Sequence, residues 1–489
     1  MLFVHLVLFA IFLILLLIVV VKNAWCSNYW KNKNVDYVIT SPVFGDLKDF
    51  ILRRKNLGYL VLEWYRRFPN KKYYGTYLFS IESLIIKDID LIKKITIKDF
   101  EYFCDHINVT DIEQEPIFGK NLTALKGKKW KEMRNFLTPS FTGNKIRLMS
   151  GLISNCAKQL NEHLLENYKN NEILEIEAKN LMSRVTIDVI STIAFGIESN
   201  SLKQDTILYK IASSTTNPSK FIFIFALIQI SFPKLAKILQ LSQLPSKETQ
   251  IFTEIIKETL KKREKHNIIR PDMIQLLNEA RKDEKITVND IIAQGFVFFL
   301  AGFEPISTLL SHLLNELALN QNVQRKLQEK LDELNDLSYD SISKIKYLDQ
   351  IVSETLRLWP PSAFTNRECV KNYLINDDLT IEKGTGIIIP IFGIHRDEKF
   401  YPNPDKFDPE RFNGPNLNPY AFIPFGIGPR NCIGSRLALL EAKVIVSHLL
   451  LKFDVVKVKR TENEVVLSRN RAALVPDSFW LGLKKRKSN

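Results

Sequence analysis

The amino-acid sequence predicts a mainly α-helical domain with small β-sheets, behind a single N-terminal transmembrane helix. Apolar residues recur at helical spacing over long stretches, most clearly at 146–168, 250–265 and 286–330. Shorter runs rich in β-branched and aromatic residues predict strands at 73–87, 384–390 and 455–466. Residues 399–429 are dense in Pro, Asn and Gly, which is typical of a loop. Since no repeat or low-complexity stretch divides the remainder, we expect one large domain over 42–489.

The N-terminus predicts a membrane anchor. Residues 2–21 carry no charged side chain, and a helix of this length extends for about 30 Å, the thickness of the bilayer hydrocarbon layer. A cleaved signal peptide, the alternative, usually begins with a basic residue and has a shorter apolar core. We therefore expect an anchor over 1–22 and a polar linker over 23–41. The Lys and Arg residues that follow predict a cytosolic domain by the positive-inside rule.

A second apolar run, residues 221–232, is too short to span a bilayer. It predicts either a buried helix or a surface patch that dips into the membrane beside the anchor.

Net charge and cysteine usage exclude several classes of protein. The chain carries 68 Lys and Arg against 54 Asp and Glu, a net charge of +14, which favours an acidic partner or an anionic membrane surface. The basic residues are spread along the whole chain without a zinc-finger or RNP-type pattern, so we expect no nucleic acid partner. The five cysteines, at positions 26, 104, 156, 369 and 432, are odd in number and widely spaced, which argues against a disulfide framework or a zinc site.

The most specific pattern in the chain surrounds Cys432. The pattern F-x-x-G-x-R-x-C-x-G is matched by Phe425, Gly428, Arg430, Cys432 and Gly434. Five fixed residues recur by chance in a chain of this length with odds on the order of one in ten thousand. A buried structural cysteine in a glycine-rich turn is the alternative, and these odds disfavour it.

The chemistry of a bound, flat, anionic ligand explains this spacing. Gly426 and Gly428 allow a tight turn and a close approach of the backbone to the ligand, and Gly434 offers no side chain to obstruct it. Arg430 can donate paired hydrogen bonds to a carboxylate. Cys432 immediately precedes an apolar helical run, residues 437–450, and the positive end of that helix favours a thiolate.

Together with four further motifs in the same order, this loop resembles the microsomal cytochrome P-450 family, and specifically its arthropod detoxification-type members. The further motifs are Lys-Trp-Lys-Glu-Met-Arg-Asn-Phe-Leu-Thr-Pro-Ser-Phe-Thr at 129–142, Ala-Gly-Phe-Glu at 301–304, Glu-x-x-Arg at 354–357 and Pro-Glu-Arg-Phe at 409–412. The likeness covers nearly the whole chain. It implies the cytochrome P-450 fold and haem b whose iron is bound by the Cys432 thiolate.

The resemblance also implies roles for residues away from the cysteine loop. It places Trp130, Arg134, Arg367, His395 and Arg430 on the haem propionates, with Phe425 and Gly434 beside the cofactor. It implies that Glu354, Arg357 and Arg411 form a buried charge cluster that fixes the loop of Cys432. Without the order of the motifs, a solvated surface pair would be the preferred interpretation of Glu354 and Arg357.

Glu304 lies within the apolar run 296–310, where an acid is costly unless it has a partner or a task. In the family the next residue is normally Thr, and the pair organises water for proton delivery. Here that position is Pro305, which has neither a hydroxyl nor an N–H and should kink the helix. We expect Glu304 and Thr308 to be the catalytic residues, although Thr308 and Ser307 lie on different faces of the helix and neither replaces the missing hydroxyl directly.

The implied reaction is monooxygenation of an apolar small molecule: a xenobiotic, a steroid or a fatty-acid-like compound. No flavin or nicotinamide motif is present, so the electrons would come from an NADPH-dependent flavoprotein reductase, with cytochrome b5 as a further donor. The reductase would dock on basic residues around the 129–142 motif (Lys126, Lys128, Lys129 and Lys131), and the membrane would be that of the endoplasmic reticulum.

We expect residues 100–122, 221–232, 298–303 and 361–364 to line the substrate pocket. A haem-thiolate isomerase or dehydratase acting on peroxides, and a non-enzymatic haem-binding protein, remain as alternatives.

Overall fold

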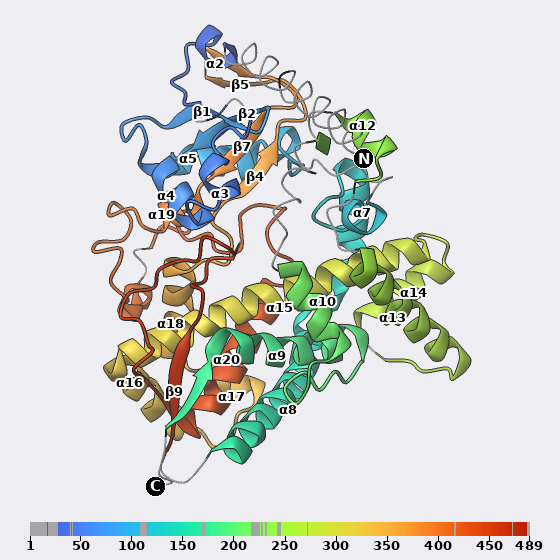
Figure 1. Ribbon diagram of the computed structural model, residues 1–489, viewed down its shortest axis with the longest axis vertical. Coiled ribbons are helices and arrows are strands. Elements are labelled where there is room, and N and C mark those ends of the chain that lie inside the picture. Colours follow the sequence, from blue (N-terminus) through green and yellow to red (C-terminus); the bar gives the residue numbers. More distant parts are fainter. Residues whose placement is uncertain are drawn as a thin grey trace, which may run out of the picture.

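The computed structural model describes residues 17, 28–39, 41, 43–107, 115–168, 173–216, 225, 228–229, 232–241, 246–270, 272–376, 378–414, 417–471 and 473–486 (Figure 1). The expected anchor over 1–22 lies outside the described residues except for residue 17, and most of the apolar run 221–232 lies outside them too.

Helices account for most of the described chain. The longer ones are α4 (Leu57–Arg66), α7 (Gly127–Leu137), α8 (Gly143–Asn167), α9 (Ala178–Ile190), α10 (Ile207–Thr216), α13 (Ser246–Lys265), α14 (Met273–Lys282), α15 (Val288–Leu319), α16 (Gln321–Asp332), α18 (Lys346–Leu358) and α20 (Ser435–Leu450). The shorter helical segments are α2 (Tyr29–Asn32), α3 (Lys48–Ile51), α5 (Ile89–Lys93), η1 (Lys94–Lys98), η2 (Phe100–Tyr102), α6 (Pro116–Gly119), η3 (Thr138–Phe141), η4 (Ser191–Phe195), α12 (Pro233–Ile238), α17 (Tyr339–Ser343), α19 (Ile391–Ile394) and η5 (Pro409–Asn413).

Three small sheets complete the fold. The first has the order β1 (Tyr73–Leu78), β2 (Ile81–Ile86), β7 (Gly386–Ile389) and β4 (Thr365–Glu368). Within it β2 and β7 are parallel and the other pairs are antiparallel. The second has the order β3 (Leu174–Glu177), β9 (Trp480–Lys485) and β8 (Phe453–Val456), and the third pairs β5 (Tyr373–Asn376) with β6 (Leu379–Ile381). The sheets therefore join segments that are far apart in the sequence.

The predicted helical stretches 146–168 and 250–265 are confirmed as α8 and α13. The stretch 286–330 is two helices, because the backbone leaves the helical region at Asn320 (φ −116°, ψ 70°) between α15 and α16. The predicted strands 73–87 and 384–390 correspond to β1, β2 and β7, whereas only the beginning of 455–466 is a strand, the end of β8. The expected loop over 399–429 contains one short 3-10 turn, η5.

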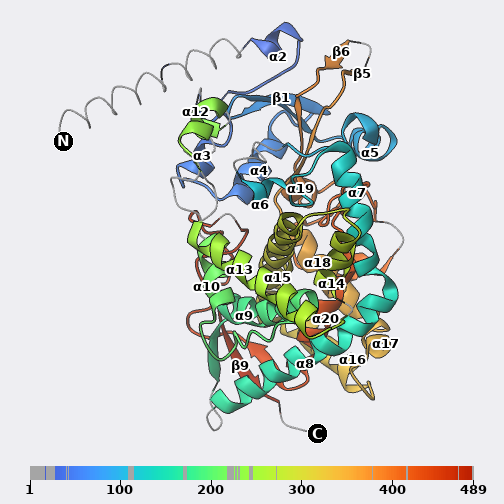
Figure 2. The same cartoon turned by 90° about the vertical axis from the view of Figure 1, so that its right-hand side faces the viewer.

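Helix α15 forms the centre of the helical part of the molecule. It begins with a capping box between Thr287 and Asp290, and it continues through Pro305 without ending there. It passes very close to α9 at Gly302, where an added Cβ would lie 2.4 Å from Cδ1 of Ile190. Figure 1 shows α15 crossing the molecule below the strands β1, β2, β7 and β4, and Figure 2 shows it surrounded by other helices.

Within the described part of the chain, α15 is the one helix long and apolar enough to cross a bilayer. However, 61% of its most apolar stretch is buried inside the fold. This burial is typical of the core helix of a folded domain, so α15 is not evidence for a membrane span.

Candidate active site

The loop that carries Cys432 is a compact turn stabilised by its own backbone. The N–H of Cys432 donates to the carbonyl of Phe425 over 2.9 Å, and the N–H of Asn431 donates to Gly428 over 3.0 Å. Gly426 and Gly428 have φ angles of +72° and +75°, which favour glycine. At Gly428 an added Cβ would lie 2.0 Å from the carbonyl oxygen of Thr96. The tight turn expected from these two glycines is therefore present.

Cys432 lies just before α20, whose N-cap is Gly434. The thiol is reachable by solvent from one side. Burial by the surrounding protein raises the pKa of the Cys432 thiol, whereas the backbone N–H of Gly434 and the positive charge of Arg134 act to lower it. The loop thus contains groups that favour a thiolate, although burial has the larger effect in the protein alone.

Cys432 opens into a cavity of about 230 Å³ between the cysteine loop, α15 and α7. Its lining residues are His106, Leu122, Thr123, Trp130, Arg134, Val297, Phe298, Ala301, Arg430, Asn431, Cys432 and Ile433. The residues from α15 are apolar and face the loop residues across the cavity. Of the segment 298–303, which was expected to line the substrate pocket, Phe298 and Ala301 are part of the lining.

Trp130 lies between two arginines at the edge of this cavity. The guanidinium carbon of Arg430 is 4.0 Å from the centre of the Trp130 ring, and that of Arg134 is 6.0 Å from it. Arg134 also donates to the carbonyl and the side-chain oxygen of Asn431, over 2.8 and 2.9 Å. Helix α7 is therefore attached to the cysteine loop through Arg134.

Arg430 already has a carboxylate partner within the chain. Its Nη2 lies 3.0 Å from Oδ1 of Asp105 and 2.8 Å from the carbonyl of Leu125, and its Nε donates to the carbonyl of Cys104 over 2.6 Å. Burial lowers the pKa of Arg430 to about 10, while Asp105 opposes this shift. Sequence reasoning missed Asp105, because nothing local links it to Arg430.

Arg367 is fully buried on β4 and does not line the cavity. It donates to the carbonyl of Ile427 in the cysteine loop over 2.9 Å, but its Nε has no partner among the described residues. Burial and the nearby charge of Arg430 lower its pKa to about 10. Arg430, which is buried, and Arg134 do line the edge of the apolar cavity, and two guanidinium groups in that position fit a cofactor that is flat, apolar and edged by carboxylates.

His395 lies elsewhere, behind the cysteine loop. Its Nδ1 is 3.1 Å from the carbonyl of Arg357, and its Nε2 accepts a hydrogen bond from the backbone N–H of Ile423 over 3.0 Å. Burial and the charge of Arg357 lower its pKa to about 3, so it is neutral. Because both ring nitrogens are engaged, no donor remains for a propionate, contrary to the expected role.

A different histidine, His106, lines the cavity. Its Nδ1 is 2.8 Å from the carbonyl of Asn366, and burial together with Arg367 and Arg430 lowers its pKa to about 3. His106 carries no signal in the sequence, because it lies in an irregular segment without a periodic pattern.

The structure brings Glu354, Arg357 and Arg411 together. Arg357 donates two hydrogen bonds to the Glu354 carboxylate, over 2.7 and 2.8 Å, and Arg411 lies 3.2 Å from the same group. Glu354 and Arg357 are fully buried. Arg411 also donates to the carbonyls of Pro402 and Asn403, so α18 is bound to the segment that leads to the cysteine loop.

Glu304 and Thr308, expected as catalytic residues, are directed away from the Cys432 cavity. Lys179 on α9 forms an ion pair with Glu304 over 3.1 Å and donates to Ser307 and Thr308, over 2.6 and 3.1 Å. One lysine therefore contacts both hydroxyl groups, even though consecutive residues of a helix project in different directions. Glu304 lines a separate cavity of about 140 Å³ instead.

The basic residues of the expected reductase surface, Lys126, Lys128, Lys129 and Lys131, are all exposed. Lys126 is paired with Glu368 and Lys128 with Glu132.

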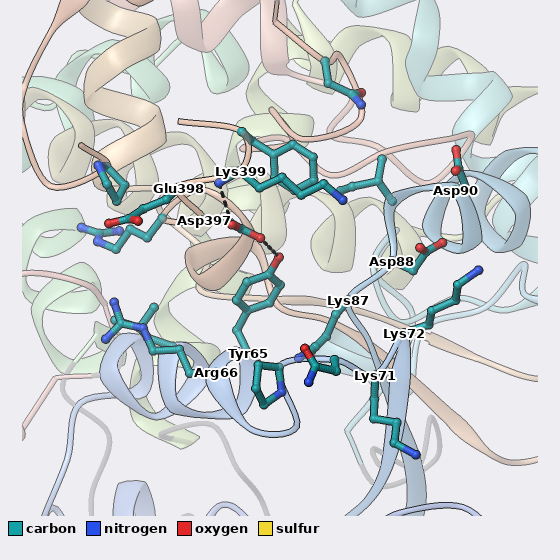
Figure 3. A pocket seen from close by; sticks show the side chains of 18 of the residues that line it. Tyr65, Arg66, Lys71, Lys72, Lys87, Asp88, Asp90, Asp397, Glu398 and Lys399 are labelled. Carbon is teal, nitrogen blue, oxygen red and sulfur yellow. Dashed lines mark hydrogen bonds between the residues drawn. The ribbon is translucent and has the colours of Figure 1, made fainter. Parts of the chain in front are cut away.

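A larger cleft of about 810 Å³ lies between the end of α4, the start of α5 and residues 396–405. Figure 3 shows Tyr65 hydrogen-bonded to Asp397 within it, among lysines and carboxylates. It does not contain Cys432, and most of its lining residues are charged or polar, so its size does not make it the reaction site.

The domain is rich in helices, and a cysteine in a glycine-rich loop faces an apolar cavity with arginines at its edge. This combination defines a haem-thiolate protein. Comparison with known proteins gives the family. The family model described as "Cytochrome P450" matches residues 39–481, and the chain belongs to this family. It is 40% identical to "Cytochrome P450 9e2" of Blattella germanica, over 96% of each chain. It is 36% identical to "Probable cytochrome P450 9f2" of Drosophila melanogaster (94% and 96%), and 34% identical to "Cytochrome P450 6j1" of Blattella germanica (90% and 90%).

The resemblance to detoxification-type insect members is thereby confirmed. The chain is an oxidoreductase of the haem-thiolate monooxygenase class, and its cofactor is haem b.

Proposed function

We propose that the chain inserts one oxygen atom of O2 into an apolar small molecule of the xenobiotic, steroid or fatty-acid-like class. The apolar wall formed by Val297, Phe298 and Ala301 opposite Cys432 is the observation that carries this proposal. Such a wall binds an apolar substrate by excluding water and offers no polar group that would fix a polar one. Bound haem supplies the activation of O2, and the thiolate ligand favours cleavage of the O–O bond.

The protein's own residues would hold the cofactor and position it. Cys432 would bind the iron, while Arg134, Arg430 and Trp130 at the cavity edge, supported by Arg367, would bind the propionates. Phe425 would fix the turn through its carbonyl, and Gly434 would begin α20 without a side chain. Glu354, Arg357 and Arg411 would keep the cysteine loop in place from behind. Within the expected pocket segments, the described cavity uses residues of 100–122 and 298–303 and none of 361–364.

Electrons would come from an NADPH-dependent flavoprotein reductase, with cytochrome b5 as a further donor. The exposed lysines of α7 support this assignment, since Lys128, Lys129 and Lys131 are exposed on the same helix that carries Trp130 and Arg134. We also propose that residues 1–22 anchor the protein in the endoplasmic reticulum membrane and that 23–41 link the anchor to a cytosolic domain, 42–489. Deleting residues 1–22 should then release a folded haem protein from membranes.

The decisive experiment uses the full chain loaded with haem. The reduced, carbon-monoxide-bound protein should absorb as a thiolate haem, and Cys432→Ser should lose that band. With reductase and NADPH, a panel of apolar compounds should include at least one that is hydroxylated or epoxidised. An unchanged band in Cys432→Ser would refute the assignment of the iron ligand.

One observation favours a second activity, the rearrangement or dehydration of peroxides. Pro305 lacks a hydroxyl, and Ser307 and Thr308 are bound to Lys179, so no described side-chain hydroxyl of 304–308 faces the Cys432 cavity. An enzyme that rearranges peroxides needs no external protons or electrons. Turnover of an organic peroxide, with none in the presence of NADPH and reductase, would favour this activity.

A further inference from the structure

The inference concerns Gln294, a glutamine on α15 that is fully buried. It lies three, four and seven residues before Val297, Phe298 and Ala301, so these four residues share one face of the helix. The last three form the apolar wall of the Cys432 cavity, whereas Gln294 is polar and is not part of the lining. Burial of an amide is unfavourable unless its donor and its acceptor both find partners.

Both partners of the Gln294 amide are backbone groups of one loop segment, residues 120–125. Its Oε1 accepts a hydrogen bond from the N–H of Leu122 over 2.9 Å, and its Nε2 donates to the carbonyl of Lys120 over 2.7 Å. Leu122 and Thr123 of this segment line the cavity. Gln294 therefore joins this part of the cavity wall to α15.

Segment 120–125 is itself a compact turn. Oδ1 of the buried Asn121 accepts hydrogen bonds from the N–H and the hydroxyl of Thr123, over 2.9 and 2.7 Å, and from the N–H of Ala124 over 3.0 Å. Such bonds from an Asn side chain to the residues that follow it hold a turn in one conformation. A contact to the backbone of this turn therefore also positions the side chains that line the cavity.

The cysteine loop holds the same segment from the other side. Nη2 of Arg430 donates to the carbonyl of Leu125 over 2.8 Å, and Nη1 donates to the carbonyl of Leu122 over the longer distance of 3.4 Å. The N–H of Leu122 is thus bound to α15 and its carbonyl to the cysteine loop. Because both of these elements enclose the cavity, the position of segment 120–125 sets how far the cavity extends between them.

The tie between the segment and α15 depends on side chains. Gln294 makes two buried hydrogen bonds to the segment, whereas Lys120 and Asp290 form an ion pair at 3.9 Å where both side chains are partly exposed. An exposed ion pair of this kind contributes little. The amide of Gln294 is therefore the contact that keeps this wall closed against α15.

We propose that Gln294 is a positioning residue that sets the size limit of the substrate, because its amide holds segment 120–125 closed against α15. With both hydrogen bonds in place, Leu122 and Thr123 confine the cavity, and compact apolar molecules fit beside the apolar wall. A bulkier molecule requires the segment to move away, which leaves two buried backbone groups without partners. This inference rests on the proposed function, because it concerns the substrate of the same site.

The test uses the haem-loaded full chain and two imidazole probes that bind iron through the same kind of nitrogen. Phenylimidazole is the compact probe and clotrimazole is the bulky one. The absorbance of the haem reports the binding of each probe, so neither turnover nor a known substrate is needed. Gln294→Met removes the donor and the acceptor and keeps a side chain of similar volume, and Gln324→Met is the matched control.

Gln324 is also buried, and its amide forms an equivalent pair of hydrogen bonds with a backbone. Its Nε2 donates to the carbonyl of Val455 over 2.8 Å, and its Oε1 accepts the N–H of Val455 over 2.7 Å. Val455 lies in β8, and neither residue lines the Cys432 cavity. The control therefore loses a similar pair of hydrogen bonds without releasing a wall of the cavity.

Gln294→Met should bind clotrimazole roughly tenfold more tightly, relative to phenylimidazole, than the unmodified protein does, because loss of the two bonds raises the population of the open segment. Hydrogen exchange of the amides in residues 120–125 should accelerate by a similar factor. Gln324→Met should leave the ratio of the two affinities unchanged and accelerate exchange in β8 instead. If Gln294→Met does not retain haem, Gln294→Asn, whose shorter amide does not reach the segment, should shift the ratio in the same direction.

An unchanged ratio of the two affinities in a Gln294 variant that retains haem would overturn the proposal, even if the variant is less stable. An equal change of the ratio in Gln324→Met would overturn it as well, since the effect would then follow from lost stability alone. Failure of the proposed function has a different signature: the unmodified protein would bind both probes and oxidise no apolar compound with reductase and NADPH.

Discussion

The imidazole of His395 joins the buried charge cluster to the cysteine loop. Its Nε2 accepts the N–H of Ile423 over 3.0 Å, and its Nδ1 faces the carbonyl of Arg357 at 3.1 Å. In return, Arg357 donates to the carbonyl of His395 over 2.8 Å. Ile423 lies two residues before Phe425, where the turn around Cys432 begins. The structure thus places His395, which was expected at the propionates, on the backbone that leads into the cysteine loop.

Replacing His395 by Ala should therefore lower stability whether or not haem is bound. It leaves the buried N–H of Ile423 without an acceptor, at a cost of roughly 1–3 kcal/mol. His395→Gln, which can supply an acceptor, should lose less. Urea unfolding of the haem-free and haem-loaded forms measures the loss of stability in each of the two variants. If His395 bound a propionate, replacing it would lower the stability of the haem-loaded protein only. That result would contradict the placement of His395 beside Arg357 and Ile423.

Replacing Glu354 by Gln should be among the most damaging single changes. It leaves Arg357 and Arg411 as buried charges without a carboxylate, which costs roughly 3–5 kcal/mol. Glu63→Gln is the control, because the Glu63 side chain is 41% exposed and pairs with Lys55 at the surface. That change should alter the free energy of unfolding by about 1 kcal/mol or less. Equal losses in the two variants would show that the buried cluster contributes no more than a surface pair.

The two glycines with positive φ in the cysteine loop should differ in their tolerance of alanine. At Gly426 the nearest atom to an added Cβ is 3.8 Å away, so Gly426→Ala adds only backbone strain of about 1–2 kcal/mol. At Gly428 the added Cβ would lie 2.0 Å from the Thr96 carbonyl, so the turn must move away from η1. We expect Gly428→Ala to lose most of the thiolate-haem band and Gly426→Ala to keep it. Similar retention of haem in both variants would contradict this.

Glu441, fully buried on α20, should make stability depend on pH. Burial raises its pKa well above the ordinary value, and its Oε1 has no partner among the described residues. Above about pH 4.5 the unfolded chain loses a proton that the folded chain keeps, so stability falls as pH rises toward the folded pKa.

Glu441→Gln keeps the shape of the side chain and cannot ionise. Its advantage in stability over the unmodified protein should grow by about 1.4 kcal/mol per pH unit between pH 5 and the folded pKa. Thermal unfolding across pH 5–8 measures this, with the exposed Glu329→Gln as control. A constant difference between Glu441→Gln and the unmodified protein across that range would mean that Glu441 does not titrate on unfolding.

Pro305→Thr should improve coupling between NADPH use and product formation. Position 305 lies one helical turn after Ala301, which lines the Cys432 cavity, so a hydroxyl there is accessible to the reaction site. A missing hydrogen-bond donor at such a site costs about 3 kcal/mol of barrier, so product per NADPH could rise by up to roughly a hundredfold. Pro305→Val restores the N–H without the hydroxyl. If Pro305→Thr and Pro305→Val raise product per NADPH equally, the gain comes from the restored backbone N–H and not from the hydroxyl.

The sequence by itself determined the features that depend on neighbouring residues. The spacing of Phe425, Gly428, Arg430, Cys432 and Gly434 identified the cysteine loop, because a tight turn is built from residues within one short segment. The three-residue interval between Glu354 and Arg357 placed the two side chains on one face of a helix, and the resemblance implied that they belong to a buried cluster. The long helices and the strands near residues 73–87 followed from periodicity in the same way.

Only the tertiary structure decided which distant segments cover these local features. Lys179 lies 125 residues before Glu304, Asp105 lies 325 residues before Arg430, and His395 meets Ile423 from a separate turn. Periodicity shows which side chains share a face of one helix, but not which helix packs against that face. That choice depends on the packing of the whole chain, which here places Lys179 of α9 against Glu304 and Thr308, neither of which lines the cavity beside Cys432.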